Sequence, residues 1–153
     1  MYKKIKRIIN EKTKIRPCAY LFRAHLEGAN LKGANLRKAN LEGSNLRGAN
    51  LEGADIRYAY LANANLENVR LYMANLRKAN LMYADLRNAD LEGAYLKGAY
   101  LKDANLEGAY LEGADLEGAN CVGTDFCNSK MDKDTKLEGM IIDDGKGNEY
   151  VLR

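Results

Sequence analysis

A five-residue phrase, Ala-Asn-Leu-Xaa-Gly, repeats without insertion from residue 19 to residue 131 of this 153-residue chain. Leu fills 19 of the 23 central positions, and Ala fills 19 of the 23 positions two residues earlier. The other central residues are Ile56, Cys121, Phe126 and Met131. One large and one small apolar residue in every repeat predict a narrow, uniform interior that packs without voids. Such a period limits the chain to a repeat architecture built from short, equal units.

The residues between the apolar positions show how many repeats form one coil. Read every twenty residues, one position alternates in charge and another alternates tyrosine with asparagine. The two series are Glu27, Arg47, Glu67, Arg87, Glu107 and Tyr20, Asn40, Tyr60, Asn80, Tyr100, Asn120. Both alternations vanish at a spacing of fifteen residues. Side chains on adjacent strands, about 4.8 Å apart, interact as pairs, so the series predict four repeats per coil.

The 23 consecutive units resemble the pentapeptide-repeat family over about three quarters of the chain. This resemblance implies an all-β, right-handed quadrilateral parallel β-helix. It also implies that the Leu and Ala positions point inward and the other three positions point outward. We expect this helix to cover residues 19–133 in about six coils. Gly and Asn at the fifth position suit the corners, where a positive φ favours these two residue types.

The first 18 residues differ from the repeats. Ile5, Ile8, Ile9 and Ile15 stand near helical spacing among lysines, and Pro17 follows. This pattern predicts an N-terminal cap over residues 1–18 that contains a short amphipathic helix ending before Pro17. One interpretation is a basic helix that binds a membrane surface or nucleic acid. We favour a cap over the open end of the solenoid, because four isoleucines without Trp or Phe make a weak membrane face.

The last twenty residues form a second expected cap, over residues 134–153. The repeat slips by one residue, so that Thr135 and Leu137 take the Ala-like and Leu-like roles. The segments GMII and YVLR then flank the turn-forming sequence DDGKGNE. This arrangement predicts a short hairpin or strand pair that closes the C-terminal end.

Charge and cysteine content narrow the partners and the compartment. Net charge is +3, but residues 1–17 carry +6, which leaves −3 for the remainder. No apolar run is long enough to span a bilayer, and the basic N-terminus lacks the features of a secretory signal. The three cysteines form neither an even disulfide set nor a zinc-binding spacing. We therefore expect a cytoplasmic protein with no membrane span.

The sequence contains no recognisable catalytic, cofactor or metal site. His25 is the single histidine and occupies an outward position, which leaves little room for a nucleophile and base pair or a histidine metal site. The phosphate-binding pattern GxxxxGK[ST] is absent, and the glycines are corner residues. We expect a protein that is not an enzyme and binds no cofactor.

Two outward surfaces are candidate binding sites. The fourth face stacks basic residues, and like charges about 4.8 Å apart repel unless an anion lies nearby. This candidate basic binding face comprises Arg37, Lys38, Arg57, Tyr58, Arg77, Lys78 and Lys97. The first face is rich in apolar and aromatic residues, and its candidate interface comprises Tyr20, Phe22, Tyr60, Met82, Tyr83, Tyr100 and Val122. The alternatives are solvated arginines on one face and a stabilising tyrosine ladder on the other.

These features predict a non-enzymatic solenoid that binds an unidentified protein partner or a second copy of itself. The alternative comes from a branch of the resembling family that mimics B-form DNA and protects DNA gyrase from quinolones. That branch typically shows an acidic surface and frequent central Phe, whereas this chain has one central Phe, Phe126, and a nearly neutral body. Direct nucleic-acid binding by the basic face is a third, weaker hypothesis.

Overall fold

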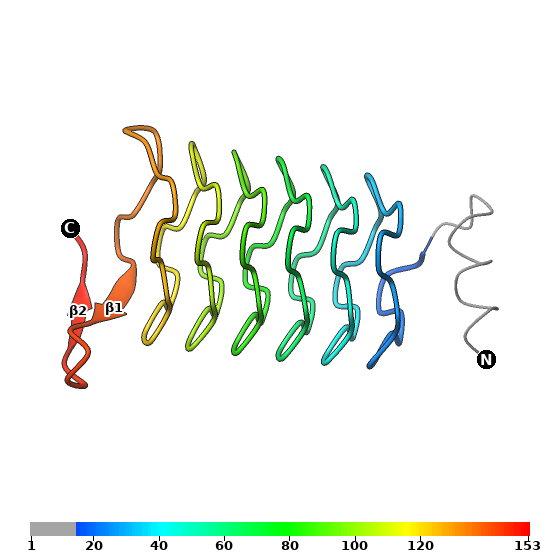
Figure 1. Ribbon diagram of the computed structural model, residues 1–153, viewed down its shortest axis with the longest axis horizontal. Coiled ribbons are helices and arrows are strands. Elements are labelled where there is room, and N and C mark those ends of the chain that lie inside the picture. The colour runs from blue at the N-terminus through cyan, green and yellow to red at the C-terminus, as the bar shows by residue number, and fades with distance from the viewer. Residues whose placement is uncertain (1–14) are drawn as a thin grey trace.

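The computed structural model describes residues 15–153 as a single row of stacked, four-sided coils (Figure 1). Parallel bridges join residues twenty apart on every face, from Tyr20 with Asn40 to Asn105 with Asp125. Backbone hydrogen bonds between coils accompany the bridges; the Leu41 N–H donates to the Tyr60 carbonyl over 2.7 Å. The structure thus confirms the prediction of four repeats per coil.

A β-turn follows each central residue and makes each corner of the coil. In the repeat centred on Leu66, its carbonyl accepts a hydrogen bond of 3.1 Å from the N–H of Val69. The third residue of this turn, Asn68, has a φ of 57°, and Gly28 has 63° at the equivalent corner two coils earlier. A positive φ strains most side chains and is readily adopted by Gly and Asn. The corner assignment of these residues is therefore confirmed.

Where an Asn or Asp precedes the central residue, its side chain makes a local hydrogen bond. Its side-chain oxygen accepts a hydrogen bond from the backbone N–H two residues later, as from Glu67 N to Asn65 Oδ1 over 3.0 Å. The same bond recurs from Val122 N to Asn120 Oδ1 over 3.2 Å. Asn and Asp make such turns more readily than other residues, because their short side chains reach the backbone two residues ahead.

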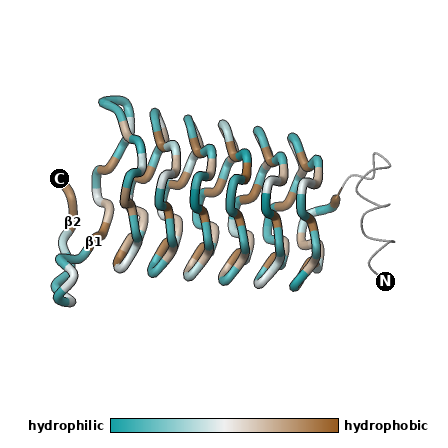
Figure 2. The backbone as a smooth tube through the Cα atoms, viewed as in Figure 1, coloured by the Kyte–Doolittle hydropathy of each residue, from teal (hydrophilic) through white to brown (hydrophobic). Residues whose placement is uncertain are grey.

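The interior is filled by the Leu and Ala positions, which are buried through the middle coils, as Leu76 and Ala79 illustrate. Figure 2 shows the resulting repetition of hydrophobic and hydrophilic positions along the stack. Met131, at the last central position, is 38% exposed and is not part of the buried interior. The third-face bridges end with Tyr110 and Lys130, so no further coil covers Met131 on that side.

A strand pair closes the C-terminal end. After the one-residue slip, Lys136 bridges Asp115, and β1 (Ile141–Asp143) then pairs antiparallel with β2 (Glu149–Val151). Ile141 bridges Asn120 on one side and pairs with Val151 on the other. The predicted slip and hairpin are confirmed, and the first face continues into a small sheet.

Most of the helix predicted before Pro17 lies outside the described residues, which begin at residue 15. Residues 15–18 are not helical and include a turn at Pro17 and Cys18. From residue 15 onward, the structure has no helix long and apolar enough to cross a membrane. The same part of the chain has no group of three or more His, Cys, Asp or Glu residues suited to a metal ion.

Candidate protein-binding surface

The basic column of the fourth face is partly neutralised by the chain itself. Asp55 chelates the Arg57 guanidinium through two hydrogen bonds, of 2.8 Å from Nε and 2.7 Å from Nη2. These bonds, above all other effects, lower the pKa of Asp55 and raise that of Arg57. The Asp is placed two residues before the Arg by the repeat itself, so the pair forms within one turn.

Two more cations of this column also find partners. Arg77 lies over the Tyr95 ring, 4.6 Å from its centroid, and its Nη2 is 3.9 Å from an Asp115 oxygen. Lys97 pairs with Glu117, and this hydrogen bond raises the pKa of Lys97. The C-terminal part of the candidate basic face therefore carries little free positive charge.

The remaining cations gather around one exposed tyrosine at the corner between the fourth and first faces. Arg37 Cζ lies 5.9 Å and Lys78 Nζ 6.0 Å from the Tyr58 ring centroid, at the outer limit of a cation–π contact. Arg37, Lys38 and Lys78 make no ion pair within residues 15–153. We call Arg37, Lys38, Tyr58 and Lys78 the Tyr58 corner.

The Tyr58 corner has strained backbone. Lys38, Tyr58 and Lys78 occupy the turn position that requires a positive φ, with values of 57°, 59° and 56°. In the next two coils Gly98 and Gly118 hold this position, with values of 65° and 63°. The backbone conformation is therefore nearly constant along this corner. The residue, however, changes from one with a large, exposed side chain to glycine.

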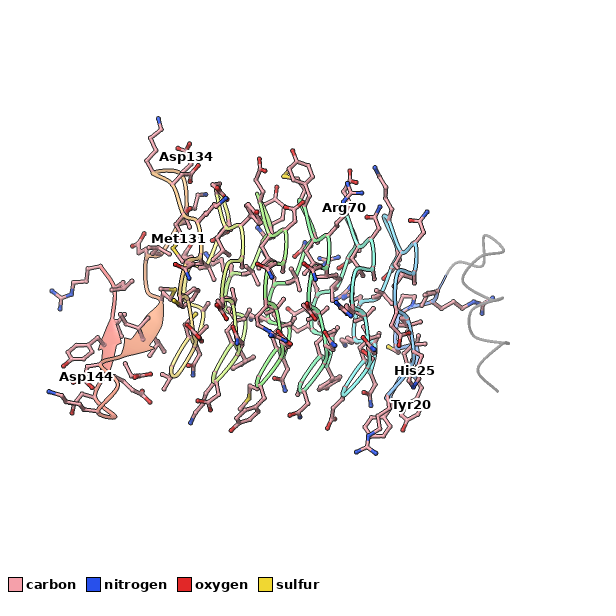
Figure 3. The ribbon with its side chains drawn as sticks, viewed as in Figure 1. Tyr20, His25, Arg70, Met131, Asp134 and Asp144 are labelled. Carbon is pink, nitrogen blue, oxygen red and sulfur yellow. The ribbon has the colours of Figure 1, made fainter. Side chains whose placement is uncertain are left out.

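The first face presents aromatic side chains to solvent. Tyr60 is 54% and Tyr100 51% exposed, and Tyr20 projects from the edge of the first coil (Figure 3). Tyr20 and Phe22 have ring centroids 6.1 Å apart. Tyr83 is also exposed at the opposite corner of this face. Met82 and Val122 are only half-buried, so the predicted members of this surface share one face and its corner.

These tyrosines occupy the position that Asn otherwise holds in the repeat. In the intervening coils Asn40 and Asn80 accept hydrogen bonds from the backbone N–H two residues ahead, each 3.1 Å long. A tyrosine side chain cannot make this local bond. The N–H groups of Ala62 and Lys102 accordingly have no hydrogen-bond partner among the described residues.

The protein-family model described as pentapeptide repeats (8 copies) matches residues 19–57, 59–98 and 94–132 of this chain. The chain belongs to the pentapeptide-repeat family. Because the chain belongs to this family, its β-helix is right-handed, as the sequence resemblance implies. No curated protein sequence matches the chain.

Several solved pentapeptide-repeat structures are similar to this chain. HetL, involved in heterocyst differentiation regulation in the cyanobacterium Nostoc sp. strain PCC 7120, is 38% identical, with a TM-score of 0.54. That match covers 84% of this chain and 64% of HetL, so this chain spans slightly less than two thirds of HetL. Rfr23 from the cyanobacterium Cyanothece 51142 is 29% identical over 88% of this chain and 98% of its own, with a TM-score of 0.39.

QnrB1, a plasmid-mediated fluoroquinolone resistance protein, is 21% identical to this pentapeptide-repeat chain. The match covers 74% of this chain and 68% of QnrB1, with a TM-score of 0.42. At this identity the similarity concerns the fold alone.

The second face of the pentapeptide-repeat helix only partly follows the predicted charge ladder. Arg47 pairs with Glu67 in the next coil, with Nε 3.1 Å from Oε2. Arg87 instead chelates Asp85 within its own turn, and this contact lowers the pKa of Asp85. The exposed His25 lies 3.1 Å from Glu27. These side chains are engaged with one another, which makes the second face a useful control surface.

The third face of the pentapeptide-repeat helix contains an acidic groove that the sequence analysis missed. Its polar lining comes from four carboxylates, and two exposed apolar side chains border it. The lining comprises Tyr72, Met73, Glu92, Gly93, Glu112, Gly113, Asp132 and Asp134. Within residues 15–153, Oε2 of Glu112 is buried and has no hydrogen-bond partner. Reading the third-face column every twenty residues, which gives Glu92, Glu112 and Asp132, would have revealed this strip.

Cys121 of this pentapeptide-repeat chain is not an activated nucleophile. Cys121 is buried at a Leu position, and burial raises the pKa of its thiol to about 12. Cys18 and Cys127 are exposed and make no disulfide. A thiol becomes reactive when its pKa is lowered toward neutrality, and the environment of Cys121 has the opposite effect.

Proposed function

We propose that this chain is a non-enzymatic protein-binding solenoid that docks a partner protein through its first face. The observation that supports this proposal is the placement of Tyr60 and Tyr100. Both are exposed at positions where Asn makes a local hydrogen bond in the intervening coils. Stability of the coil alone favours Asn at these positions, so the tyrosines require another explanation.

Exposed tyrosines on a rigid wall are well suited to recognition. Tyrosine is enriched in protein interfaces, because it contributes a large contact area and a hydroxyl with few rotatable bonds. The half-buried Met82 lies in the coil between Tyr60 and Tyr100, and the half-buried Val122 extends the apolar surface into the coil after Tyr100. The first face is already ordered by inter-coil hydrogen bonds, so docking costs little conformational entropy.

The partner is an unidentified protein, and a second copy of this chain is the other occupant that the same surface fits. We place the protein in the cytoplasm, where the exposed thiols of Cys18 and Cys127 stay reduced. We propose no cofactor.

Site-specific photo-crosslinking tests the proposal directly. A benzophenone amino acid replaces Tyr60 or Tyr100 in one set of samples and Asn105, on the second face, in another. After irradiation in a lysate of the source organism, we expect one protein to be crosslinked from both first-face positions and not from position 105. Equal crosslinking from all three positions would contradict docking through the first face.

A matched set of substitutions sharpens this test. Tyr60→Asn and Tyr100→Asn together restore the common repeat residue and its local hydrogen bond, so the fold is retained. Tyr110→Asn makes the same change on the third face. We expect the first-face double variant to lose the captured protein and the third-face variant to retain it.

The alternative function is a DNA-mimic inhibitor or protector of a DNA-binding enzyme such as gyrase, and the acidic groove on the third face is the surface where such mimicry would act. A gyrase supercoiling assay with and without a quinolone tests it. Protection that is lost in a Glu92→Gln and Glu112→Gln variant would support the mimic. We expect no effect, because Lys130 and Lys133 lie beside the groove carboxylates in the sequence of the last coil, which gives the strip mixed charge.

A further inference from the structure

The Tyr58 corner adjoins the first face directly, since only Ala59 separates Tyr58 from Tyr60. We infer that this corner is an anion-recognition site that binds Glu and Asp side chains of an acidic, extended segment of the partner. The inference rests on the proposed protein-binding function and adds the chemistry of the partner. Its support comes from backbone strain, charge and position.

The strain argument begins with residues that the fold does not need. Large side chains at a positive φ are disfavoured, since Cβ approaches the following carbonyl oxygen, whereas Gly adopts this conformation freely. Lys38, Tyr58 and Lys78 are all exposed, so core packing does not offset the strain. Glycine occupies the same position in the next two coils, at Gly98 and Gly118, with nearly the same backbone conformation. Arg23, Met73 and Tyr83 adopt the same conformation at other corners, so the strain identifies side chains that the fold does not need, and the charge of this corner then points to its function.

The charge argument concerns an ion pair between Asp and Arg that forms within one repeat elsewhere in the coil but not at this corner. An Asp two residues before an Arg chelates it within the turn, as Asp55 does for Arg57. Asn35 stands in that relation to Arg37, and its oxygen accepts only the Arg37 backbone N–H, over 3.3 Å. The Arg37 guanidinium makes no ion pair among the described residues, although its charge helps to lower the pKa of Asp55 in the next coil. It can bind an external carboxylate with two hydrogen bonds.

The size of the corner fits a short peptide segment. Successive coils lie about 4.8 Å apart, so the Lys38 and Lys78 backbones are separated by about 10 Å, the length of about three extended residues. Tyr58 stands between them and gives an apolar surface for the segment. A nucleic-acid backbone is a poorer match, because affinity for it rises with the number of phosphate contacts, and Asp55 interrupts the row of cations.

Fluorescence anisotropy with defined probes tests the inference. The probes are a labelled peptide of about ten residues that alternates Glu and Ser, its Gln and Ser counterpart, and a single-stranded DNA oligonucleotide of similar length. We expect the wild-type protein to bind the Glu peptide at low salt, to release it as salt rises, and to ignore the Gln peptide. Failure to bind the Glu peptide, or tighter binding of the oligonucleotide, overturns the inference.

The decisive variant is the triple substitution Lys38→Gly, Tyr58→Gly and Lys78→Gly. We expect it to bind the Glu peptide about tenfold more weakly or worse, while its melting temperature rises by a few degrees. Met73→Gly removes a large residue at a φ of 55° from another corner and serves as the control. It raises the melting temperature without changing peptide binding. Unchanged binding by the triple variant overturns the inference.

A second variant keeps the side-chain bulk and reverses only the charge. Lys38→Glu with Lys78→Glu is expected to abolish Glu-peptide binding, and retained binding counts against the site. The photo-crosslinking experiment separates the two proposals. Crosslinks from Tyr60 without Glu-peptide binding refute the anion site alone, whereas absence of first-face crosslinks refutes the docking function on which it rests.

Discussion

The interior of the solenoid and its fourth-face corner respond differently to the same repeating backbone. In the interior, the central position of the fourth face stays large, apolar and buried in four successive coils, at Leu36, Ile56, Leu76 and Leu96. At the corner two residues later, the side chain changes from Lys38 to glycine within three coils, although φ stays near 60°. Packing therefore explains why the interior residues are large and apolar. The backbone conformation does not explain why the corner residues Lys38, Tyr58 and Lys78 are large.

The difference shows which substitutions stability explains and which it does not. A cavity in the interior removes contacts from several coils at once, so selection for folding keeps the column uniform. At the corner, stability favours glycine, because no packing compensates for the positive φ. The following four substitution experiments measure this contrast, from the largest expected change in the free energy of unfolding to the smallest.

Leu76→Ala should have the largest effect. Leu76 is fully buried in a middle coil, and we expect the free energy of unfolding to fall by about 3 kcal/mol. Urea unfolding followed by circular dichroism measures the loss. Met131→Ala is the control at the end of the interior, and we expect a loss below about 1 kcal/mol, since Met131 is already exposed. Similar losses at both sites would contradict the described packing.

The corner substitutions should act in the opposite direction. We expect Lys38→Gly, Tyr58→Gly and Lys78→Gly together to raise the free energy of unfolding by about 2 kcal/mol, because each relieves a strained turn. The converse change, Gly98→Lys, should lower it by about 1 kcal/mol. Urea unfolding of both variants tests the contrast. A less stable triple variant would show that the large side chains stabilise the coil.

Ser44→Ala should stabilise the interior by about 1 kcal/mol. Ser44 occupies an Ala position, and its buried hydroxyl has no hydrogen-bond partner in the described part of the chain. Thr124 also occupies an Ala position, but its Oγ1 donates a hydrogen bond to the Leu101 carbonyl over 2.8 Å. We therefore expect Thr124→Ala to destabilise the protein under the same urea assay. Destabilisation by Ser44→Ala would indicate a partner for the hydroxyl that the structure lacks.

The smallest expected change in the free energy of unfolding comes from the carboxylates that chelate arginine, and it is seen only at acidic pH. Arg57 and Arg87 lower the pKa values of Asp55 and Asp85 below the ordinary 3.8. Each carboxylate then binds a proton less readily in the folded than in the unfolded state, so its contribution is complete above about pH 4 and is lost as the pH falls further. We expect Asp55→Asn with Asp85→Asn to flatten the decline in stability below pH 4.

The control for the acid experiment is Asp103→Asn, since no arginine donates a hydrogen bond to Asp103 within residues 15–153. Urea midpoints measured from neutral pH to about pH 2.5 should decline as steeply in this variant as in the wild type. An equally steep decline in the double variant would show that the two arginine contacts do not stabilise the folded state.

The fold could be predicted from the sequence because its determinants are local and periodic. The Leu and Ala columns indicated the inward positions, and the series from Tyr20 to Asn120 predicted the coil of four repeats that the bridges confirm. The exposure of Met131 was not predicted, since a periodic pattern does not show which coil lacks a neighbour. The N-terminal helix lies mostly outside the described residues and stays a prediction.

The candidate surfaces were less predictable, because charges depend on side-chain geometry. The column from Arg37 to Lys97 looks uniformly basic in the sequence, yet Asp55 and Glu117 neutralise two of its cations. These partners come from a neighbouring column and from the next coil, so reading a single column does not show them. The free charge that remains lies at the Tyr58 corner, a narrower site than the predicted basic face.

The most direct test of the central claim is the location of a bound acidic peptide on the protein. Backbone amide chemical shifts of isotope-labelled protein, followed during titration with the Glu and Ser peptide, give that location. We expect the largest changes at residues 37–40, 57–62 and 77–82, where the Tyr58 corner meets the first face. Changes centred on the second or third face, with these residues unaffected, would contradict the account.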